Sequence, residues 1–189
     1  MKPLERPLIL ASTSPRRQFL MTEAGYTFRI EAPDSEEHFP DFMPAEMVPK
    51  LLAEEKAKPF KERITNEIVL TADTVVIQAG RILNKPANRQ EAIQMLSMLA
   101  GKTHKVITAV CLLAGEKQEL FDDSTKVTFR PLSEYEIEFY VDTYKPFDKA
   151  GAYGAQDWLG MVGIEKINGS YFTVMGLPMH KVYTHLRDF

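Results

Sequence analysis

The chain has 189 residues, of which 44% are hydrophobic, and a formal net charge of −3 from 23 Lys and Arg against 26 Asp and Glu. This length and hydrophobic content are typical of one globular domain with a substantial core, so we expect a single domain over residues 1–189. The slightly negative charge gives no attraction to a polyanion, which argues against a nucleic-acid-binding protein. This net charge is still compatible with a site in which a few converging cations bind a small anion.

The sequence favours a reduced compartment and no membrane partner. No stretch approaches the roughly 18 to 20 apolar residues of a membrane span, and the first residues lack the apolar run and cleavage site of a signal peptide. The single cysteine, Cys111, cannot form an internal disulfide. Its place in the apolar run 106–113 indicates a buried strand thiol rather than a nucleophile. We therefore expect a cytoplasmic protein.

Hydrophobic periodicity in the first half of the chain predicts strands that alternate with helices. Apolar runs indicate strands at 7–11, 26–31 and 68–77, and the last of these turns at Ala79 and Gly80 toward a further strand at 81–83. Helical spacing indicates helices at 15–24, ended by Gly25, and from Pro44 to about residue 60. The acidic, proline-punctuated segment between residues 32 and 44 predicts a loop.

The second half continues this alternation and adds a hairpin. We expect a helix capped by Asn88 and closed by Gly101, a β-hairpin of 105–113 and 118–129, and a helix opened by Ser133 with Glu136 three residues later. After a glycine-rich stretch, the sequence predicts a short strand at Tyr171–Met175 and a final helix after Pro178. The whole pattern predicts an α/β fold with a mixed β-sheet.

The segment STSPRR, residues 12–17, allows two interpretations. It places backbone amides, hydroxyl groups and the guanidinium groups of Arg16 and Arg17 at a strand-to-helix junction, which is a good site for a phosphate. Alternatively, Ser14 caps the helix, Pro15 occupies its first position and the arginines are solvated. Because cations repel the positive end of a helix dipole, two arginines at this position favour a bound anion.

Asp73 lies in the apolar stretch TADTVV and is the best candidate for a functional acid. A carboxylate in a buried strand is unfavourable unless a cation, a metal ion or hydrogen bonds compensate it. The alternative is a structural cap of the following turn. Lys85, just past the predicted turn, can supply a cation to the same place, although a lysine in a loop is more commonly solvated.

Two further segments carry candidate binding residues. Small residues in 148–158 let the backbone approach a ligand, and Gln156 offers both an amide donor and an acceptor; an ordinary turn-rich loop is the alternative. The pair Glu36 and Glu37 can bind a divalent cation through carboxylate oxygens, or can be plain surface. The four histidines show no zinc-site spacing, and no P-loop or GxGxxG motif occurs.

Taken in order, these stretches resemble the Maf family of nucleoside triphosphate pyrophosphatases over nearly the whole chain, on LILASTSPRR, LLAEEKA, LTADTVV, LNKPANRQEA, FDKAGAYGAQ and GSYFTVMGLP. The resemblance implies hydrolysis between the α and β phosphates of a nucleoside triphosphate, with Mg²⁺ or Mn²⁺ as cofactor. It implies one Maf-like domain with an elongated mixed β-sheet flanked by helices and two lobes around a cleft, similar to the inosine triphosphate pyrophosphatases. It also implies a homodimer.

The resemblance implies a role for each candidate residue. Asp73 becomes the catalytic residue that orients and deprotonates water, and it coordinates the metal ion together with Glu37, or with Glu36 if the loop is shifted by one. The substrate-binding residues are Ser12, Arg16, Arg17, Lys56, Thr74, Lys85 and Gln156. Thr74 and Gln156 resemble the members that prefer dTTP and UTP, and a glutamine amide can pair with both the N3–H donor and a carbonyl of such a base.

Two departures from the family pattern and two alternative functions accompany this interpretation. Asn84 stands where the family usually has Gly, and we expect it to keep the turn through a positive φ. Asp157 stands where the family often has Gly after the glutamine. The alternatives are a nucleotide-binding regulator of cell division and septum formation with little turnover, and the same hydrolysis acting on 7-methyl-GTP. A pure binder needs the cations but has no need of Asp73 beside them.

Overall fold

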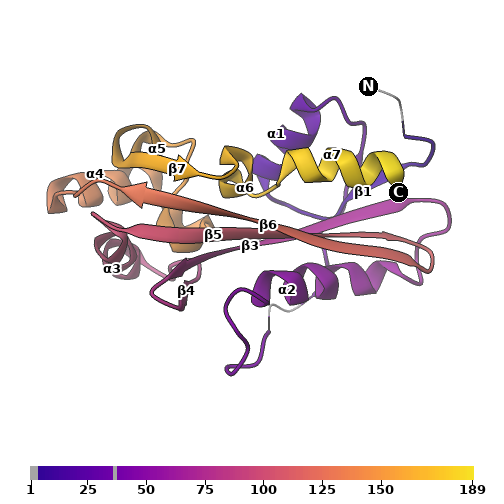
Figure 1. Ribbon diagram of the computed structural model, residues 1–189, viewed down its shortest axis with the longest axis horizontal. Helices are drawn as coiled ribbons and strands as arrows, with labels where there is room; N and C mark the ends of the chain where they lie inside the picture. The colour runs from indigo at the N-terminus through magenta and orange to yellow at the C-terminus, as the bar shows by residue number, and fades with distance from the viewer. Residues whose placement is uncertain (1–3, 36–37) are drawn as a thin grey trace. The chain divides into compact units, whose positions relative to one another are not determined.

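The computed structural model describes residues 4–35 and 38–189 (Figure 1). Its strands are β1 (Leu8–Leu10), β2 (Arg29–Ile30), β3 (Ile68–Gln78), β4 (Arg81–Leu83), β5 (Thr103–Ala114), β6 (Lys117–Phe129) and β7 (Ile164–Asn168). Within the described residues they form one seven-stranded sheet in the order β2-β1-β3-β5-β6-β7, with β4 paired to β3. β1 pairs in parallel with β2 and β3, whereas β4 and β7 pair antiparallel, so the predicted mixed sheet is confirmed.

Helices alternate with these strands, which confirms the α/β class. They are α1 (Pro15–Glu23), α2 (Val48–Ala57), α3 (Arg89–Leu99), α4 (Glu134–Tyr144), α5 (Trp158–Gly163), α6 (Tyr171–Met175) and α7 (Met179–Asp188). Short 3₁₀ turns lie at Lys58–Phe60, Pro146–Asp148 and Ala150–Ala152. In the described parts of the chain, no helix combines the length and the apolar character needed to cross a membrane.

Contacts divide the chain into two compact units. The first unit comprises Met1–Asp73, Thr108–Asp123 and Gly176–Phe189, and the second comprises Thr74–Ile107 and Ser124–Met175. The long strands β3, β5 and β6 each contribute residues to both units. The single domain over residues 1–189 and the two lobes around a cleft stay predictions.

The first unit packs its apolar side chains from β1, α2, β3 and β5 into one cluster. Figure 1 shows α1 and α7 on one side of its strands and α2 on the other. Cys111 is fully buried in this cluster, so its interpretation as a strand thiol is confirmed. The buried members are Ile9, Ala11, Ala53, Ala57, Phe60, Val69, Ala109, Cys111 and Leu113.

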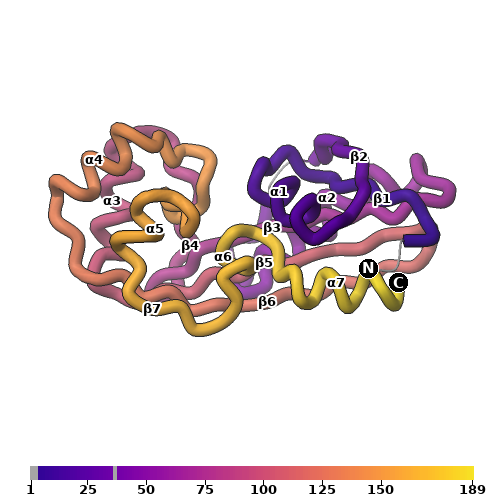
Figure 2. Tube along the Cα trace, turned by 90° about the horizontal axis from the view of Figure 1, so that it is seen from above, coloured from indigo at the N-terminus to yellow at the C-terminus, as the bar shows by residue number. Residues whose placement is uncertain are grey.

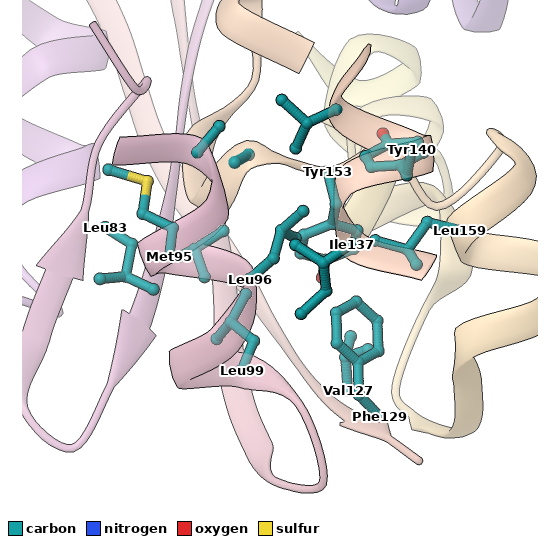
Figure 3. Packing of buried hydrophobic residues seen from close by; sticks show 14 of the residues in the cluster. Leu83, Met95, Leu96, Leu99, Val127, Phe129, Ile137, Tyr140, Tyr153 and Leu159 are labelled. Carbon is teal, nitrogen blue, oxygen red and sulfur yellow. The ribbon is translucent and has the colours of Figure 1, made fainter. Parts of the chain in front are cut away.

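The second unit has a separate apolar core, in which α3 packs against α4 (Figure 2). Both predicted helix starts are confirmed. The Asn88 side chain accepts a hydrogen bond from the backbone N–H of Glu91, and Ser133 and Glu136 form a reciprocal capping box. The core side chains include Leu83, Met95, Leu96, Leu99, Val127, Phe129, Ile137, Tyr140, Tyr153 and Leu159 (Figure 3).

The strand predicted at Tyr171–Met175 is wrong, because this segment forms the helix α6. The edge of β6 pairs instead with Ile164–Asn168, a strand that the sequence interpretation missed. The chain leaves that strand at Gly169, whose φ of +130° is rarely adopted by other residues, and Thr125 Oγ1 then donates to Ser170 O at 3.0 Å. With this edge of β6 already paired, the β-branched and aromatic residues that follow form a short helix.

The helix predicted from Pro44 begins later than expected. The backbone N–H of Met47 donates to the carbonyl of Pro44 at 2.8 Å, which closes a turn, and α2 starts at Val48 with Pro49 in its first turn. Proline lacks a backbone N–H, so it fits the first turn of a helix but not its interior. Pro49 therefore sets the helix start four residues after Pro44.

Candidate active site

A buried ion pair joins α2 to β3. Lys56 Nζ lies 2.5 Å from Asp73 Oδ1, and each side chain is only 10% exposed. β3 runs without a break through Asp73, so this carboxylate lies within the strand and not at its end. Removing a carboxylate from water is unfavourable unless a paired cation compensates its charge, as Lys56 does here. Two predicted site residues are thus brought together within the first unit.

The sequence of α2 explains why a lysine points inward. The buried residues of this helix recur at intervals of four, as Val48, Leu52 and Lys56, so the lysine lies on the face that packs against the sheet. On β3, Thr71 Oγ1 donates to the carbonyl of Ala53 at 2.6 Å. Because side chains on a strand alternate between faces, Asp73 points to the same side as Thr71, toward α2.

Arg17 ties three segments together beside this ion pair. Its Nε donates to the carbonyl of Gly176 at 2.9 Å, and its Nη1 donates to the carbonyl of Ala72 at 2.8 Å. The same Nη1 lies 3.4 Å from the Oγ of Ser12, which is buried and also accepts from the backbone N–H of Ser14 at 3.2 Å. Arg17 therefore supports the backbone of β3 next to Asp73.

The alternative in which the Ser14 side chain caps α1 is wrong. Ser14 occupies the N-cap position in an extended conformation with Pro15 after it, but its side chain makes no capping hydrogen bond within the described chain. No acidic residue lies in the first turn of this helix. The positive end of α1 is thus compensated neither by the predicted cap nor by a carboxylate of its own first turn, which favours the anion interpretation.

The other predicted substrate-binding residues belong to the second unit. Thr74 follows Asp73 on β3, Lys85 follows β4 and is exposed, and Gln156 precedes α5. Ser12, Arg16, Arg17, Lys56 and Asp73 belong to the first unit. The assembly of these two groups into one site stays a prediction.

Asn84 does not have the positive φ that we expected for its turn. Among the described non-glycine residues, positive φ occurs at Ala79, Lys145 and Ala152, so the expectation for Asn84 is wrong. Ala79 and Gly80, with φ of 50° and 77°, make the left-handed turn between β3 and β4. The carbonyl of Asn84 instead accepts from the backbone N–H of Gly151 at 3.2 Å, which ties the segment before Lys85 to the glycine-rich stretch.

Gln156 carries a buried polar atom without a partner. Its Oε1 is out of contact with solvent and makes no hydrogen bond to any described residue. Buried polar atoms in proteins almost always have a partner, so an unpaired one is a candidate contact for a ligand. The role of Gln156 in binding substrate stays a prediction.

The sequence interpretation missed two residues next to Gln156. Tyr140 Oη donates to Asp157 Oδ2 at 2.9 Å and accepts from the backbone N–H of Gly154 at 3.0 Å. Both contacts join α4 to the segment that carries Gln156. The one feature of the sequence that could have pointed to them is Asp157 itself, which departs from the glycine that the family resemblance implies.

The predicted metal ligands are described only in part, since Glu36 and Glu37 lie outside the described residues. No group of three or more His, Cys, Asp or Glu side chains able to hold a metal ion occurs among the residues that are described. Asp73 provides one hard carboxylate ligand beside a cationic group. A single carboxylate can serve as one ligand of Mg²⁺, which commonly binds one or two carboxylates together with water and substrate phosphates rather than a cage made only of protein.

Comparison with known proteins gives consistent matches over nearly the full length. The family described as "Maf-like protein" matches residues 7–189. A protein of Bacteroides fragilis named dTTP/UTP pyrophosphatase is 49% identical over 183 residues, covering 96% of this chain and 95% of the relative. A protein of the same name from Cytophaga hutchinsonii is 46% identical, covering 95% and 82%. Among solved structures, a HAM1 protein from Coxiella burnetii is 13% identical with a TM-score of 0.49, covering 97% and 100%.

Proposed function

This chain belongs to the Maf family, and we propose that it hydrolyses nucleoside triphosphates between the α and β phosphates, releasing a monophosphate and pyrophosphate. The relatives named dTTP/UTP pyrophosphatase support dTTP and UTP as the substrates. The observation that carries the proposal is the buried pair of Asp73 and Lys56, with Arg17 on the carbonyl next to it. A protein that only bound nucleotides would not need this carboxylate.

Asp73 is the proposed general base. Its carboxylate orients the attacking water and accepts a proton from it, so no covalent nucleophile is required. Lys56 fixes the position of the carboxylate through the contact of 2.5 Å. Arg17 holds the carbonyl of Ala72 and so fixes the adjacent backbone.

The triphosphate carries several negative charges that the protein must balance. In the proposed site, the first turn of α1 with Ser12 and Arg16 binds phosphate oxygens, and Arg17, Lys56 and Lys85 add positive charge. Charge that grows on the pyrophosphate leaving group is thereby stabilised in the transition state. Preorganised cations of this kind supply most of the catalysis in phosphoryl transfer.

Mg²⁺ or Mn²⁺ is the proposed cofactor. Asp73 would hold it, with Glu37, or Glu36, as a second carboxylate from the loop. When bound, a divalent cation supplies charge neutralisation to the phosphates and Lewis acidity to the reacting phosphoryl group. We expect EDTA to abolish turnover and excess Mg²⁺ to restore it.

Gln156 and Thr74 are the proposed determinants of base preference. Uracil and thymine present an N3–H donor between two carbonyl acceptors, whereas the N3 of cytosine is an acceptor. A buried carbonyl oxygen such as Gln156 Oε1 accepts from the first kind of base and meets a lone pair of the second. The polarity of this atom therefore supports dTTP and UTP over CTP.

The proposal includes a homodimer, which follows from the family resemblance, and a location in the cytoplasm, which follows from the sequence. Light scattering coupled to size-exclusion chromatography tests the dimer, with a monomer mass as the contradicting result. A regulator of cell division with little turnover, and hydrolysis of 7-methyl-GTP, are the alternatives that an activity assay separates from the proposal.

The experiment is an assay of pyrophosphate release, coupled to inorganic pyrophosphatase, with dTTP, UTP, CTP and 7-methyl-GTP side by side. We expect turnover of dTTP and UTP, and its loss in Asp73→Asn. Asp142→Asn is the matched control, because Asp142 is an exposed carboxylate paired with Arg89 on the surface. Substantial activity in Asp73→Asn would exclude Asp73 as the base, and turnover of 7-methyl-GTP alone would exclude the proposed substrates.

A further inference from the structure

The segment Tyr153–Asp157 before α5 is fixed at several points by side chains of other elements. The hydroxyl of Tyr140, on α4, accepts from the backbone N–H of Gly154 and donates to Asp157 Oδ2. Tyr140 is fully buried, and burial raises its pKa above the ordinary value, so the hydroxyl keeps its proton. At the start of the segment, Tyr153 Oη lies 2.7 Å from Nε2 of the buried His104. The segment is therefore held by the core beneath it.

The Asp157 carboxylate does not cap α5 within the described chain, although Asp157 occupies the N-cap position of that helix. It is the N-cap residue of α5 in an extended conformation, where an aspartate commonly accepts from the first backbone N–H groups. Its side chain makes no such hydrogen bond to a described residue, and turns instead to Tyr140. Lys149 Nζ, 3.8 Å from the same Oδ2, adds an opposite charge. The carboxylate thus serves to fix this segment and not to start the helix.

Gly154 connects these contacts to Gln156. A Cβ at this glycine would lie 2.6 Å from Asp157 Oδ2 and 2.9 Å from Gln156 Nε2, closer than side chains can approach. The amide of Gln156 therefore packs directly on the backbone that Tyr140 and Asp157 hold. The Oε1 atom of the same amide is buried and makes no hydrogen bond to a described residue.

We propose that Tyr140 and Asp157 are positioning residues that fix the Gln156 amide so that Oε1 accepts the N3–H of a uracil or thymine base. The inference rests on the proposed function and deepens it. Neither residue touches the reacting phosphates; both act on the orientation of a third side chain. Loss of either lets the amide rotate, which weakens binding of bases with an N3–H and admits cytosine.

The test compares Tyr140→Phe and Asp157→Ala with Tyr144→Phe in dTTP and CTP hydrolysis. Tyr144 stacks on Tyr140 at a ring distance of 5.2 Å but is partly exposed, so its variant is a matched control. We expect KM for dTTP to rise roughly tenfold and the dTTP-to-CTP ratio of kcat/KM to fall roughly tenfold, with kcat for dTTP within about twofold. A merely structural role would lower kcat for both nucleotides together and leave KM and the ratio unchanged, which would overturn the inference.

Gly154→Ala provides a second variant, in case Tyr140→Phe does not fold. Its backbone is outside the left-handed region, so the added methyl group acts by displacing the side chains of Gln156 and Asp157. We expect the same rise in KM and the same loss of discrimination. An unchanged ratio in this variant would contradict the role of the segment in reading the base.

Binding measurements separate this inference from the proposed function. Calorimetric titration with the non-hydrolysable α,β-methylene analogues of dTTP and dCTP, which share the same sugar, reports base reading without turnover. Preference of the unaltered protein for the thymidine analogue, lost in Asp157→Ala, supports the inference even if no hydrolysis occurs. Equal affinity of the unaltered protein for both analogues overturns it, whatever the turnover.

Discussion

Lys56 and Asp73 form a buried contact of 2.5 Å although they are 17 positions apart in the chain. The contact brings the last turn of α2 onto the centre of β3. Breaking a buried ion pair by removing one partner is strongly unfavourable, because the remaining charge is left without compensation. The same pair therefore connects the proposed chemistry to the stability of the first unit.

Lys56→Met should lower the free energy of unfolding by about 3–5 kcal/mol, because it removes the cation that compensates the buried Asp73 carboxylate. Adding Asp73→Asn to this variant should recover most of the loss, since an amide carries no charge. Urea denaturation at pH 7 measures both. Lys58→Met is the control: its ammonium is exposed and paired with Glu55, so we expect a change below about 1 kcal/mol. Additive effects of the two substitutions would contradict the coupling.

Arg17→Lys should be more damaging than Arg16→Lys. A lysine carries all its donors on one nitrogen, so it does not reproduce the separate contacts of Nε to Gly176 and of Nη1 to Ala72. The loss of this geometry should lower the free energy of unfolding by about 2 kcal/mol. We expect Arg17→Lys also to reduce kcat, since Ala72 adjoins Asp73, whereas Arg16→Lys should mainly raise KM for the triphosphate. Thermal unfolding and steady-state kinetics distinguish them, and equal effects on both would contradict the assignment.

His104 should make the free energy of unfolding decrease as the pH is lowered. Its ring is buried, and burial lowers its pKa from 6.5 to about 4. Between these two values the unfolded chain binds a proton that the folded chain does not, so the free energy of unfolding decreases as pH falls from about 6.5 to 4, by about 3 kcal/mol from this group. The contribution is fully present above pH 6.5.

His104→Phe tests this pH dependence. Phenylalanine keeps ring contacts with Phe129 and Tyr153 but does not titrate. Stability measured by urea denaturation at pH 7 and pH 4.5 should differ less in the variant than in the unaltered protein. The comparison isolates His104, because the two proteins differ at this residue alone. An identical pH dependence would show that His104 is not the group involved.

Cys111 should be unreactive in the folded protein. Burial raises the pKa of its thiol to about 12, so almost no thiolate forms at pH 8, and no reagent reaches it. We expect Ellman's reagent to label the chain only after denaturation, with one equivalent of thiolate released per chain. Labelling at the rate of a free thiol under native conditions would contradict the burial of this strand.

The sequence predicted those features of the fold and the candidate site that depend on local chemistry. The caps at Asn88 and Ser133 need only side chains three residues away, and both are confirmed. The unfavourable burial of a charge pointed to Asp73 from its neighbours alone. Its partner Lys56 was assigned from the family resemblance, because no local pattern distinguishes a buried lysine from a solvated one.

The features that sequence interpretation misjudged depend on contacts distant in the chain. Tyr171–Met175 has strand-forming residues, but β7 already occupies the edge of β6. The Tyr140 hydroxyl and the Asp157 carboxylate meet only after α4 and the segment before α5 have packed. Such pairings depend on the final position of each element, which a single sequence does not specify locally.

The two ends of the strand order bear on how this protein avoids edge-to-edge strand pairing with another chain. β2, at one end, has only two residues and both are exposed; β7, at the other, carries Glu165 and Lys166 toward solvent. Short and charged edge strands are poor templates for a second chain. The apolar stretch of β5, by contrast, lies inside the order and would favour cross-β stacking if exposed. Variants that loosen the native state are therefore expected to aggregate on heating more readily than the unaltered protein.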